Sequence, residues 1–459
     1  MPTLRKRTEL PVTAAAAFAW HERPGALERL TPPWASMTVE QPPDGLAVGT
    51  QVVLRTGIGP IRPRWVAEHV VYDPPREFRD VQRSGPFAQW DHRHLFEDLP
   101  AGRSALTDEV TYRLPLERAL PPFARRLLDR QVERMFAYRH DRTLADLTAH
   151  ANANAKERTM RVAITGASGM IGRALSAFLT TGGHEVVPMV RRQAGPGQIG
   201  WDPTRGTVET EKLRGVDAVV HLAADPIQPR PLTDDKRARL RNSRVDGTRT
   251  IATALAAMSD GPQTLVFASG SNVYGHRGDE ILTEDSAPGT DGFLTQIVHD
   301  WEAAAEPARA AGLRVVAVRT GIVLDRAATI LKALGTLTRL GAAAPVGSGQ
   351  QYWPWISIDD TVGLYLHALT NAEVAGPLNA SAPTPVTNED FTRTLAKVLR
   401  RPVLPLRVPK FVPALLLRRE LADALLFTSM RMTPAKAEAT GYTFASPSLE
   451  QTLRDLYGR

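Results

Sequence analysis

The sequence predicts an α/β domain with a doubly wound parallel sheet, preceded by a smaller α+β domain. From residue 160 onward, short apolar strands alternate with amphipathic helices, which is the pattern of βαβ units. Before residue 150, segments with β-branched residues precede one long helical stretch. The polar segment 149–158 separates these patterns. We therefore expect a first domain at 1–150 and a linker at 151–159.

The first domain is expected to begin with a short helix over 13–20. Partial alternation of β-branched and polar residues then predicts strands over 51–55, 64–72 and 105–114. After Pro121 and Pro122, which suit the start of a helix, apolar residues recur at spacings of three and four. This spacing predicts a long helix with one apolar face, formed by Phe123, Leu127, Leu128, Val132, Met135 and Phe136.

The second domain shows short strand patterns separated by helical ones. Strands are expected over 161–165, 185–190, 218–222, 264–269 and 315–319. Helical stretches between them include 171–180 and 244–258. No internal repeat accompanies this alternation, which favours a single parallel sheet.

A glycine-rich turn lies between the first of these strands and the following helix. Gly166, Gly169 and Gly172 form a G-x-x-G-x-x-G pattern. Glycine permits a tight turn and a close approach of the backbone to a pyrophosphate, and the helix N-terminus supplies free N–H groups. Strand, turn and helix follow in the expected order, so we expect a dinucleotide-binding site. The alternative is a tight turn without a ligand.

The end of the second strand indicates which dinucleotide binds. NAD-binding proteins place an acidic residue about 20 residues after the glycines, where it binds the ribose 2′-hydroxyl. Here the strand over 185–190 ends in Arg191 and Arg192, with no acidic residue. Because guanidinium groups pair well with a phosphate, the sequence favours NADP(H) over NAD(H). The alternative is that both arginines are solvated in a loop.

Six motifs in a fixed order carry a family resemblance. They are Thr165–Gly172, His221–Ile227, Arg244–Thr248, Ser269–Gly275, Arg319–Leu324 and Trp355–Asp360. The chain resembles the extended short-chain dehydrogenase/reductase, or NAD-dependent epimerase/dehydratase, superfamily, and within it the branch called epimerase family proteins. The resemblance implies a Rossmann domain over 160–404 and a C-terminal extension of unknown function over 405–459.

The resemblance also implies roles for individual residues. Those that would hold the pyrophosphate are Gly166, Ser168, Gly169, Met170, Ile171 and Gly172. Arg191, with Arg192 beside it, would meet the adenosine phosphate. Those lining the cofactor past the fourth strand would be Leu222, Ala223 and Ala224. Ser269 and Ser271 would face the nicotinamide and the substrate. The pair Asp359 and Asp360 would close the substrate side, or else cap a helix beside a solvated neighbour.

The catalytic pair of this superfamily is missing. Short-chain dehydrogenases use Tyr-x-x-x-Lys on one helix face, where the lysine lowers the tyrosine pKa. None of the 8 tyrosines has a lysine four residues later, and alignment on Trp301-Glu302 places Leu294 and Val298 at the two positions. The usual serine position is Gly270, between Ser269 and Ser271. Candidate substitutes, each with a structural role as the alternative, are Tyr274, His299 and Asp300.

The first domain resembles the START-like, or SRPBCC, superfamily, which includes polyketide cyclase/dehydrase domains. The segments that carry the resemblance are 8–20, 21–34 and the long helix after Pro121. The resemblance implies a curved antiparallel sheet that grips a C-terminal helix around an apolar cavity. It implies an apolar or amphipathic small-molecule ligand, with a filled core as the alternative.

Composition limits the expected partners and location. Lys+Arg number 56 and Asp+Glu 49, but the basic residues are scattered, so we expect no nucleic-acid partner. No run approaches the ~20 apolar residues of a membrane span, and we expect the stretch 412–427 to form an amphipathic helix packed on the protein. With no cysteine and no signal-peptide pattern, the expected location is the cytoplasm.

A metal site is not expected. His92 and His94 alternate in a strand next to Asp91, and alternate residues share one face. No third ligand is spaced convincingly, however, and the chain has no HExxH motif.

The sequence thus predicts an NADP(H)-dependent oxidoreductase or epimerase for a small-molecule substrate, for which a hydrophobic compound is one candidate. Its catalytic candidates are Ser269, Ser271 and Tyr274. The alternative is a non-catalytic NADP(H)-binding sensor or scaffold with a ligand-binding START-like module. Cyclase-type chemistry in the first domain is a third hypothesis, without a catalytic constellation to support it. The substrate, the reaction direction and the oligomeric state are left open.

Overall fold

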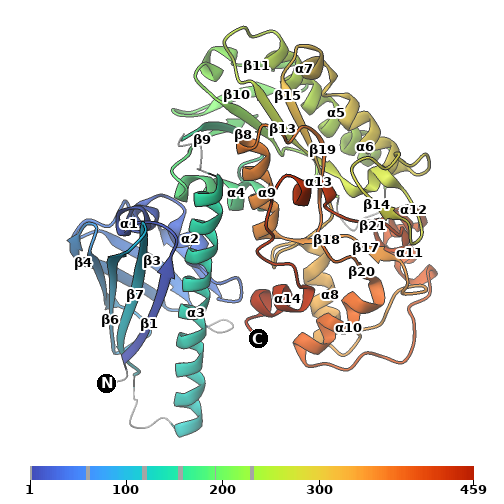
Figure 1. The fold of residues 1–459 in the computed structure, drawn as a ribbon. Coiled ribbons are helices and arrows are strands. Elements are labelled where there is room, and N and C mark those ends of the chain that lie inside the picture. Colours follow the sequence, from blue (N-terminus) through green and yellow to red (C-terminus); the bar gives the residue numbers. More distant parts are fainter. Residues whose placement is uncertain (1–2, 58–61, 116–120, 154–158, 192, 228–231) are drawn as a thin grey trace. The chain divides into compact units, whose positions relative to one another are not determined.

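The computed structural model describes residues 3–57, 62–115, 121–153, 159–191, 193–227 and 232–459. The chain divides near residue 158 into two compact units, and each has its own sheet (Figure 1). Within the described residues, none of the helices is long and apolar enough to cross a membrane. Most of the predicted linker, 154–158, lies outside the described residues.

The N-terminal unit is an antiparallel sheet of seven strands in the order β1-β7-β6-β5-β4-β3-β2. Its strands are β1 (Thr3–Leu10), β2 (Met37–Gln41), β3 (Gln51–Thr56), β4 (Arg64–Asp73), β5 (Glu77–Ser84), β6 (Gln89–Leu99) and β7 (Arg103–Arg113). Its helices are α1 (Ala14–Glu22), α2 (Ala26–Leu30) and α3 (Pro122–Ala153). The antiparallel sheet with a long C-terminal helix confirms the predicted START-like architecture.

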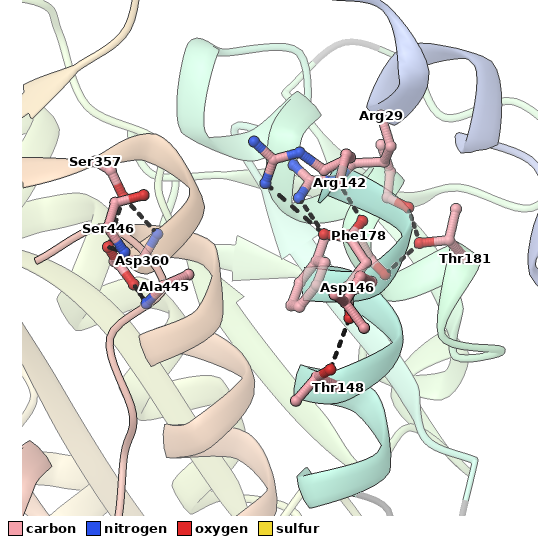
Figure 2. Close-up of polar contacts among 12 residues, drawn as sticks. Arg29, Arg142, Asp146, Thr148, Phe178, Thr181, Ser357, Asp360, Ala445 and Ser446 are labelled. Atoms are coloured by element: carbon pink, nitrogen blue, oxygen red, sulfur yellow. Dashed lines mark hydrogen bonds and ion pairs between the residues drawn. The ribbon is translucent and has the colours of Figure 1, made fainter. Parts of the chain in front are cut away.

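Helix α3 packs on the sheet through only part of its length. Val132 and Phe136 are buried against Trp90, Tyr112 and neighbouring side chains of the sheet. The predicted apolar face is wrong at its start, because the side chains of Phe123 and Leu127 are 74% and 57% exposed. Farther along α3, Asp146 accepts two hydrogen bonds from Arg29 of α2 and lies 3.8 Å from Arg142 (Figure 2).

The second unit is built on an eight-stranded sheet in the order β11-β10-β9-β8-β12-β13-β15-β19. Its strands are β8 (Arg161–Thr165), β9 (Glu185–Val190), β10 (Ile199–Asp202), β11 (Thr207–Val208), β12 (Ala218–His221), β13 (Thr264–Gly270), β15 (Arg314–Thr320) and β19 (Gly376–Ala380). All neighbours are parallel except β10 and β11. The order β10-β9-β8-β12-β13-β15 is that of a dinucleotide-binding doubly wound sheet, which confirms the predicted fold class.

Helices cover both faces of this sheet (Figure 1). One layer contains α5 (Asp234–Ala256), α6 (Phe293–Ala303) and α7 (Glu306–Ala310), whose apolar residues share a core with the strands. The opposite layer contains α4 (Met170–Thr181) and α9 (Ile358–Thr370). The predicted helix over 244–258 is longer than expected, since α5 begins at Asp234, where Thr233 accepts a capping hydrogen bond.

Several short elements complete the unit, some before β19 in the chain and some after it. Paired strands are β14 (Ile281–Leu282) with β21 (Arg431–Met432), β16 (Ile322–Leu324) with β18 (Trp355–Ser357), and β17 (Tyr352–Trp353) with β20 (Val386–Thr387). The helices here are α8 (Thr329–Arg339), α10 (Asn388–Leu399), α11 (Phe411–Leu417), α12 (Arg419–Ala422), α13 (Ala435–Ala439) and α14 (Leu449–Tyr457). The predicted helix over 412–427 is wrong as one element, because Arg418 adopts a positive φ of 60° and ends α11.

Candidate functional site

The glycine turn sits between the end of β8 at Thr165 and the start of α4 at Met170. Gly166 has φ 69°, a conformation that favours glycine. A Cβ on Gly172 would lie 2.2 Å from the carbonyl oxygen of Gly166, so the first turn of α4 can approach the loop only without a side chain there. Ser168 and Gly169 are exposed at this turn, and the free amides of a helix N-terminus suit an anion.

The segment after β12 lies directly against this turn. A Cβ on Gly166 would be 2.9 Å from the amide nitrogen of Ala223. The Thr165 hydroxyl accepts hydrogen bonds from the amides of Leu222 and Ala223, at 3.1 and 3.2 Å. The structure therefore brings together two groups of residues that the sequence predicts around one cofactor. A glycine cradle, a helix N-terminus and a short-side-chain wall fit the pyrophosphate of a dinucleotide.

Arg191 follows the end of β9 and its side chain is exposed. No acidic side chain occurs between Glu185, at the start of this strand, and Arg191. Arg192 lies outside the described residues. The exposed guanidinium of Arg191 is thus available to a ligand at the carboxyl end of the strand.

Three polar residues form one row across the carboxyl ends of adjacent strands. Ser269 of β13 is in register with Arg319 of β15, which is in register with Asn379 of β19. All three are buried, with exposed fractions of 4%, 5% and 0%. Ligands of open α/β sheets bind at this edge.

Glu302 of α6 forms hydrogen bonds with two members of this row, Ser269 and Arg319. Its Oε1 accepts hydrogen bonds from Ser269 Oγ at 2.6 Å and from Arg319 Nε at 2.9 Å, and its Oε2 accepts from Arg319 Nη2 at 2.9 Å. Although burial opposes it, Glu302 raises the pKa of Arg319, so the guanidinium stays charged. In the sequence, Glu302 and Arg319 stand out only as parts of motifs that carry the family resemblance. The pairing of a buried arginine with a glutamate on the neighbouring helix carries no local sequence signal.

Tyr274 is held within the core by this network. Its hydroxyl accepts a hydrogen bond from Arg319 Nη1 at 3.0 Å and donates to Asn379 Oδ1 at 2.7 Å. The side chain is fully buried, and burial raises the pKa of the phenol. These contacts favour the structural role that the sequence left as the alternative for Tyr274. Ser271, in contrast, begins the 3₁₀ helix η4 (Ser271–Tyr274) directly after the row.

Leu294 and Val298, which the sequence alignment assigns to the missing catalytic pair, lie on α6. They lie four residues apart, and both are buried in apolar clusters. A Cβ on Gly270 would be 3.5 Å from Val298 Cγ2, so this helix face does meet the usual serine position. The other two candidates have structural partners: His299 Nε2 contacts the Gly289 carbonyl at 2.9 Å, and Asp300 pairs with Arg241 at 2.8 Å.

A cavity of about 700 Å³ opens beside η4. Its walls include Asn272 and the loop 288–292, together with Leu421 and Ala424 from the C-terminal extension. The side-chain amide of Asn272 donates to the Ala424 carbonyl at 3.2 Å. The extension therefore forms one wall of this cavity. Asn272, which directly follows Ser271 in the chain, lines the cavity as well.

The carboxylate of Asp360 anchors the extension to α9 (Figure 2). Its oxygens accept hydrogen bonds from the amides of Ala445 and Ser446, at 2.7 and 3.0 Å, and from Ser357 Oγ at 2.7 Å. Ser357 caps α9 by accepting from the Asp360 amide. The cap of α9 is thus Ser357 and neither Asp359 nor Asp360, which makes the predicted helix-cap alternative wrong, and Asp360 instead fixes a distant part of the chain.

Family models match three successive parts of the chain. Residues 10–136 match the polyketide cyclase/dehydrase and lipid transport model, and residues 162–380 match the NAD dependent epimerase/dehydratase family. Residues 408–456 match a domain of unknown function.

Relatives and solved structures agree with these matches. An epimerase family protein of Mycobacterium leprae is 38% identical over 64% of this chain and 94% of that protein. A nucleoside-diphosphate sugar epimerase from Corynebacterium glutamicum is 33% identical, with a TM-score of 0.80 over 99% of this chain and 90% of that one. Human epimerase family protein SDR39U1, solved with NADPH, is 32% identical, with a TM-score of 0.58 over 65% of this chain and 100% of that one.

Proposed function

The chain belongs to the NAD-dependent epimerase/dehydratase family, and from this premise we propose that it is an NADP(H)-dependent oxidoreductase or epimerase. Its substrate is an unidentified small molecule, for which a hydrophobic compound is one candidate. The N-terminal START-like module would hold or deliver such a compound. The supporting observation is the cradle at Gly166, Gly169 and Gly172, packed against the segment that begins at Leu222.

The preference for NADP(H) is supported by Arg191. An exposed guanidinium at the end of β9, where no carboxylate competes, would bind a 2′-phosphate by charge-assisted hydrogen bonds. The human relative solved with NADPH supports the same choice. Met170, Ile171 and Gly172, at the start of α4, would hold the pyrophosphate together with Ser168.

When bound, the cofactor supplies the hydride. We propose that Ser269 and Ser271 meet the nicotinamide and the substrate at the carboxyl edge of the sheet. The Ser269 hydroxyl donates a hydrogen bond to the Glu302 carboxylate. The lone pairs of its oxygen can therefore accept a hydrogen bond from a substrate hydroxyl. Hydrogen bonds from Arg319 keep the Glu302 carboxylate in place. The Tyr274 hydroxyl accepts a further hydrogen bond from Arg319 and so positions the guanidinium.

The second candidate function is a non-catalytic NADP(H)-binding sensor or scaffold. It is favoured by one observation, the burial of Leu294 and Val298 where the family carries its tyrosine and lysine. Neither side chain can move a proton, and general acid–base catalysis typically contributes 10²–10⁴-fold. Under this hypothesis the START-like module binds an apolar ligand, and the form of the bound cofactor, NADPH or NADP⁺, reports the redox state of that cofactor pair.

Calorimetric titration of the full chain with NADPH, NADP⁺, NADH and NAD⁺ tests the shared part of both candidates. We expect micromolar binding of NADPH or NADP⁺, near −8 kcal/mol, and weaker binding of the other two. Binding of none of the four would overturn the proposal. A positive result leads to a screen of small carbonyl and hydroxyl compounds for oxidation of NADPH or reduction of NADP⁺, which separates the enzyme from the sensor.

A further inference from the structure

A row of ionisable residues crosses the inner face of the N-terminal sheet. His69 of β4 is in register with Asp80 of β5, which is in register with His92 of β6. Two residues farther along β6, His94 is in register with Asp108 of β7. Side chains directly opposite on neighbouring strands lie about 5 Å apart at Cβ, so this register brings the five groups together. Their exposed fractions are low, and His92 is only 2% exposed.

Asp80, His92 and His94 direct one ligand atom each toward a common point. Asp80 Oδ2 lies 3.3 Å from His92 Nδ1 and 3.8 Å from His94 Nε2, and all three atoms lie within 4.8 Å of one another. Zinc bonds to imidazole nitrogen and carboxylate oxygen are about 2.0–2.2 Å, so tetrahedral ligands of one ion lie roughly 3.4 Å apart. The observed separations therefore match a shared ion after small side-chain movements.

The remaining ring nitrogens face a second carboxylate. His94 Nδ1 and His92 Nε2 lie 2.9 and 3.5 Å from Asp108 Oδ1, and Asp108 Oδ2 lies 3.2 Å from His140 Nε2 of α3. Histidines that bind a metal commonly present their other nitrogen to a carboxylate, which fixes the ring orientation. Asp108 occupies that position for both rings.

The polar contacts within this cluster are close, but several lack the geometry of hydrogen bonds. Among the described residues, His92 Nε2, His94 Nδ1, Asp108 Oδ1, His140 Nε2 and His69 Nδ1 are buried atoms without a hydrogen-bond partner of normal geometry. In the described part of the chain, the carboxylates of Asp80 and Asp108 pair with histidines, and neither pairs with a lysine or an arginine. A divalent cation at the common point would balance these two buried carboxylates while the imidazole rings stay neutral.

We propose that the N-terminal domain binds a divalent transition-metal ion through Asp80, His92 and His94. Two imidazoles and one carboxylate, with no thiolate, suit Zn²⁺, Fe²⁺ or Co²⁺ and leave coordination positions open for a ligand. His69, whose Nδ1 has no hydrogen-bond partner, is a candidate for a fourth position.

The third ligand is not apparent from the sequence, because the acidic neighbour of His92 in the chain is Asp91. Strand alternation places Asp91 on the opposite face, where Arg79 binds it through two nitrogens. Asp80 comes from the adjacent strand, and only the register of β5 with β6 reveals it. The expectation of no metal rested on the lack of this ligand.

Equilibrium dialysis of the full chain, without a histidine tag, against Zn²⁺ or Co²⁺ tests the proposal. We expect about one ion per chain by elemental analysis, and for Co²⁺ a visible spectrum of nitrogen and oxygen ligands without a thiolate band. Asp80→Asn and His94→Gln should each weaken binding at least about tenfold. Asp91→Asn, which removes a carboxylate from the other face of the same sheet, should bind like the wild type.

Two outcomes would overturn the proposal. One is a wild-type chain that retains neither Zn²⁺ nor Co²⁺ at micromolar free ion. The other is undiminished binding by Asp80→Asn and His94→Gln, which would place the ion elsewhere. Because the wild-type measurement stands alone, failure of a variant to fold does not rescue the proposal, and circular dichroism of each variant identifies that case.

Discussion

Arg319 and Glu302 form a two-pronged ion pair at the carboxyl edge of the parallel sheet, with both N–O distances at 2.9 Å. Their side chains are 6% and 16% exposed, so the pair is largely desolvated. The same glutamate accepts a hydrogen bond from the Ser269 hydroxyl, and the same guanidinium donates one to the Tyr274 hydroxyl. One ion pair therefore holds Ser269 and Tyr274 together next to the proposed nicotinamide position.

Removing the charge of Glu302 should destabilise the second domain. Glu302→Gln leaves Arg319 buried without a counter-ion, and breaking a buried pair from one side costs about 3–5 kcal/mol. We expect a loss of about this size in the free energy of unfolding measured with urea. Glu306→Gln is the matched control, because that side chain is 68% exposed and pairs with Arg309 at 3.5 Å. A loss below about 1 kcal/mol for Glu302→Gln would contradict the structural role assigned to the pair.

Local patterns sufficed to predict the doubly wound sheet and the cofactor loop. β8 and β9 begin and end where the periodicity places them, because each is a short apolar segment bounded by turns. The loop at Gly166 is equally visible, since its backbone conformation and tight packing require glycine itself.

Features that depend on register or on distant segments could not be predicted. Prediction of the row formed by Ser269, Arg319 and Asn379 requires the order of three strands. Prediction of the pair formed by Asp80 and His92 requires the register of β5 with β6. At the start of α3, apolar residues recur with the spacing of a buried helix face, although the side chains there are exposed. Periodicity does not show where the sheet that covers the helix ends.

Asp360 is expected to hold the C-terminal extension. Asp360→Ala removes the carboxylate that accepts hydrogen bonds from the part-buried amides of Ala445 and Ser446, and a hydrogen bond to a charged group contributes about 1.5–3 kcal/mol. We expect a lower free energy of unfolding by at least about 2 kcal/mol, with faster amide exchange in the extension. Asp390→Ala is the control: it removes an acid at the same place in the first turn of α10, but at an exposed capping box, and should cost about 1 kcal/mol. Equal losses in the two variants would show that Asp360 contributes no more than an ordinary acidic residue in the first turn of a helix.

Arg191→Ala should separate the two nicotinamide cofactors. A charge-assisted hydrogen bond contributes about 1.5–3 kcal/mol, so NADPH binding should weaken roughly 10- to 100-fold, with little change for NADH. Calorimetry with both cofactors measures the difference. Arg205→Ala, which removes an 81% exposed arginine elsewhere in the domain, should change neither affinity. Equal loss of both cofactors in Arg191→Ala would contradict the 2′-phosphate assignment.

Gly172→Ala should weaken cofactor binding without unfolding the domain. The new Cβ would lie 2.2 Å from the Gly166 carbonyl oxygen, so the loop and the first turn of α4 must move apart. Overpacking of this kind costs about 1–3 kcal/mol of stability, which a domain with its own core tolerates. We expect at least a tenfold loss of NADPH affinity together with unchanged circular dichroism. Wild-type affinity in this variant would show that the cradle is not the binding site.

His221 should make the stability of the second domain depend on pH below neutrality. The ring is fully buried, and burial lowers its pKa from 6.5 to about 4. Because the Thr165 hydroxyl accepts from two backbone amides, its own proton is directed at His221 Nδ1, which lies 2.7 Å away and accepts it in the neutral ring. Protonating this nitrogen would therefore break the contact as well as bury a charge.

The direction of the effect follows from proton binding. Between pH 6.5 and about 4 the unfolded chain binds a proton at His221 that the folded chain does not, so stability falls as pH falls. The shift corresponds to about 3 kcal/mol, present in full above pH 6.5 and lost on acidification toward pH 4. Urea unfolding of the wild type and of His221→Gln at several pH values measures this contribution as the difference between their pH slopes. Parallel slopes in the two proteins would mean that the buried imidazole is not the group that titrates.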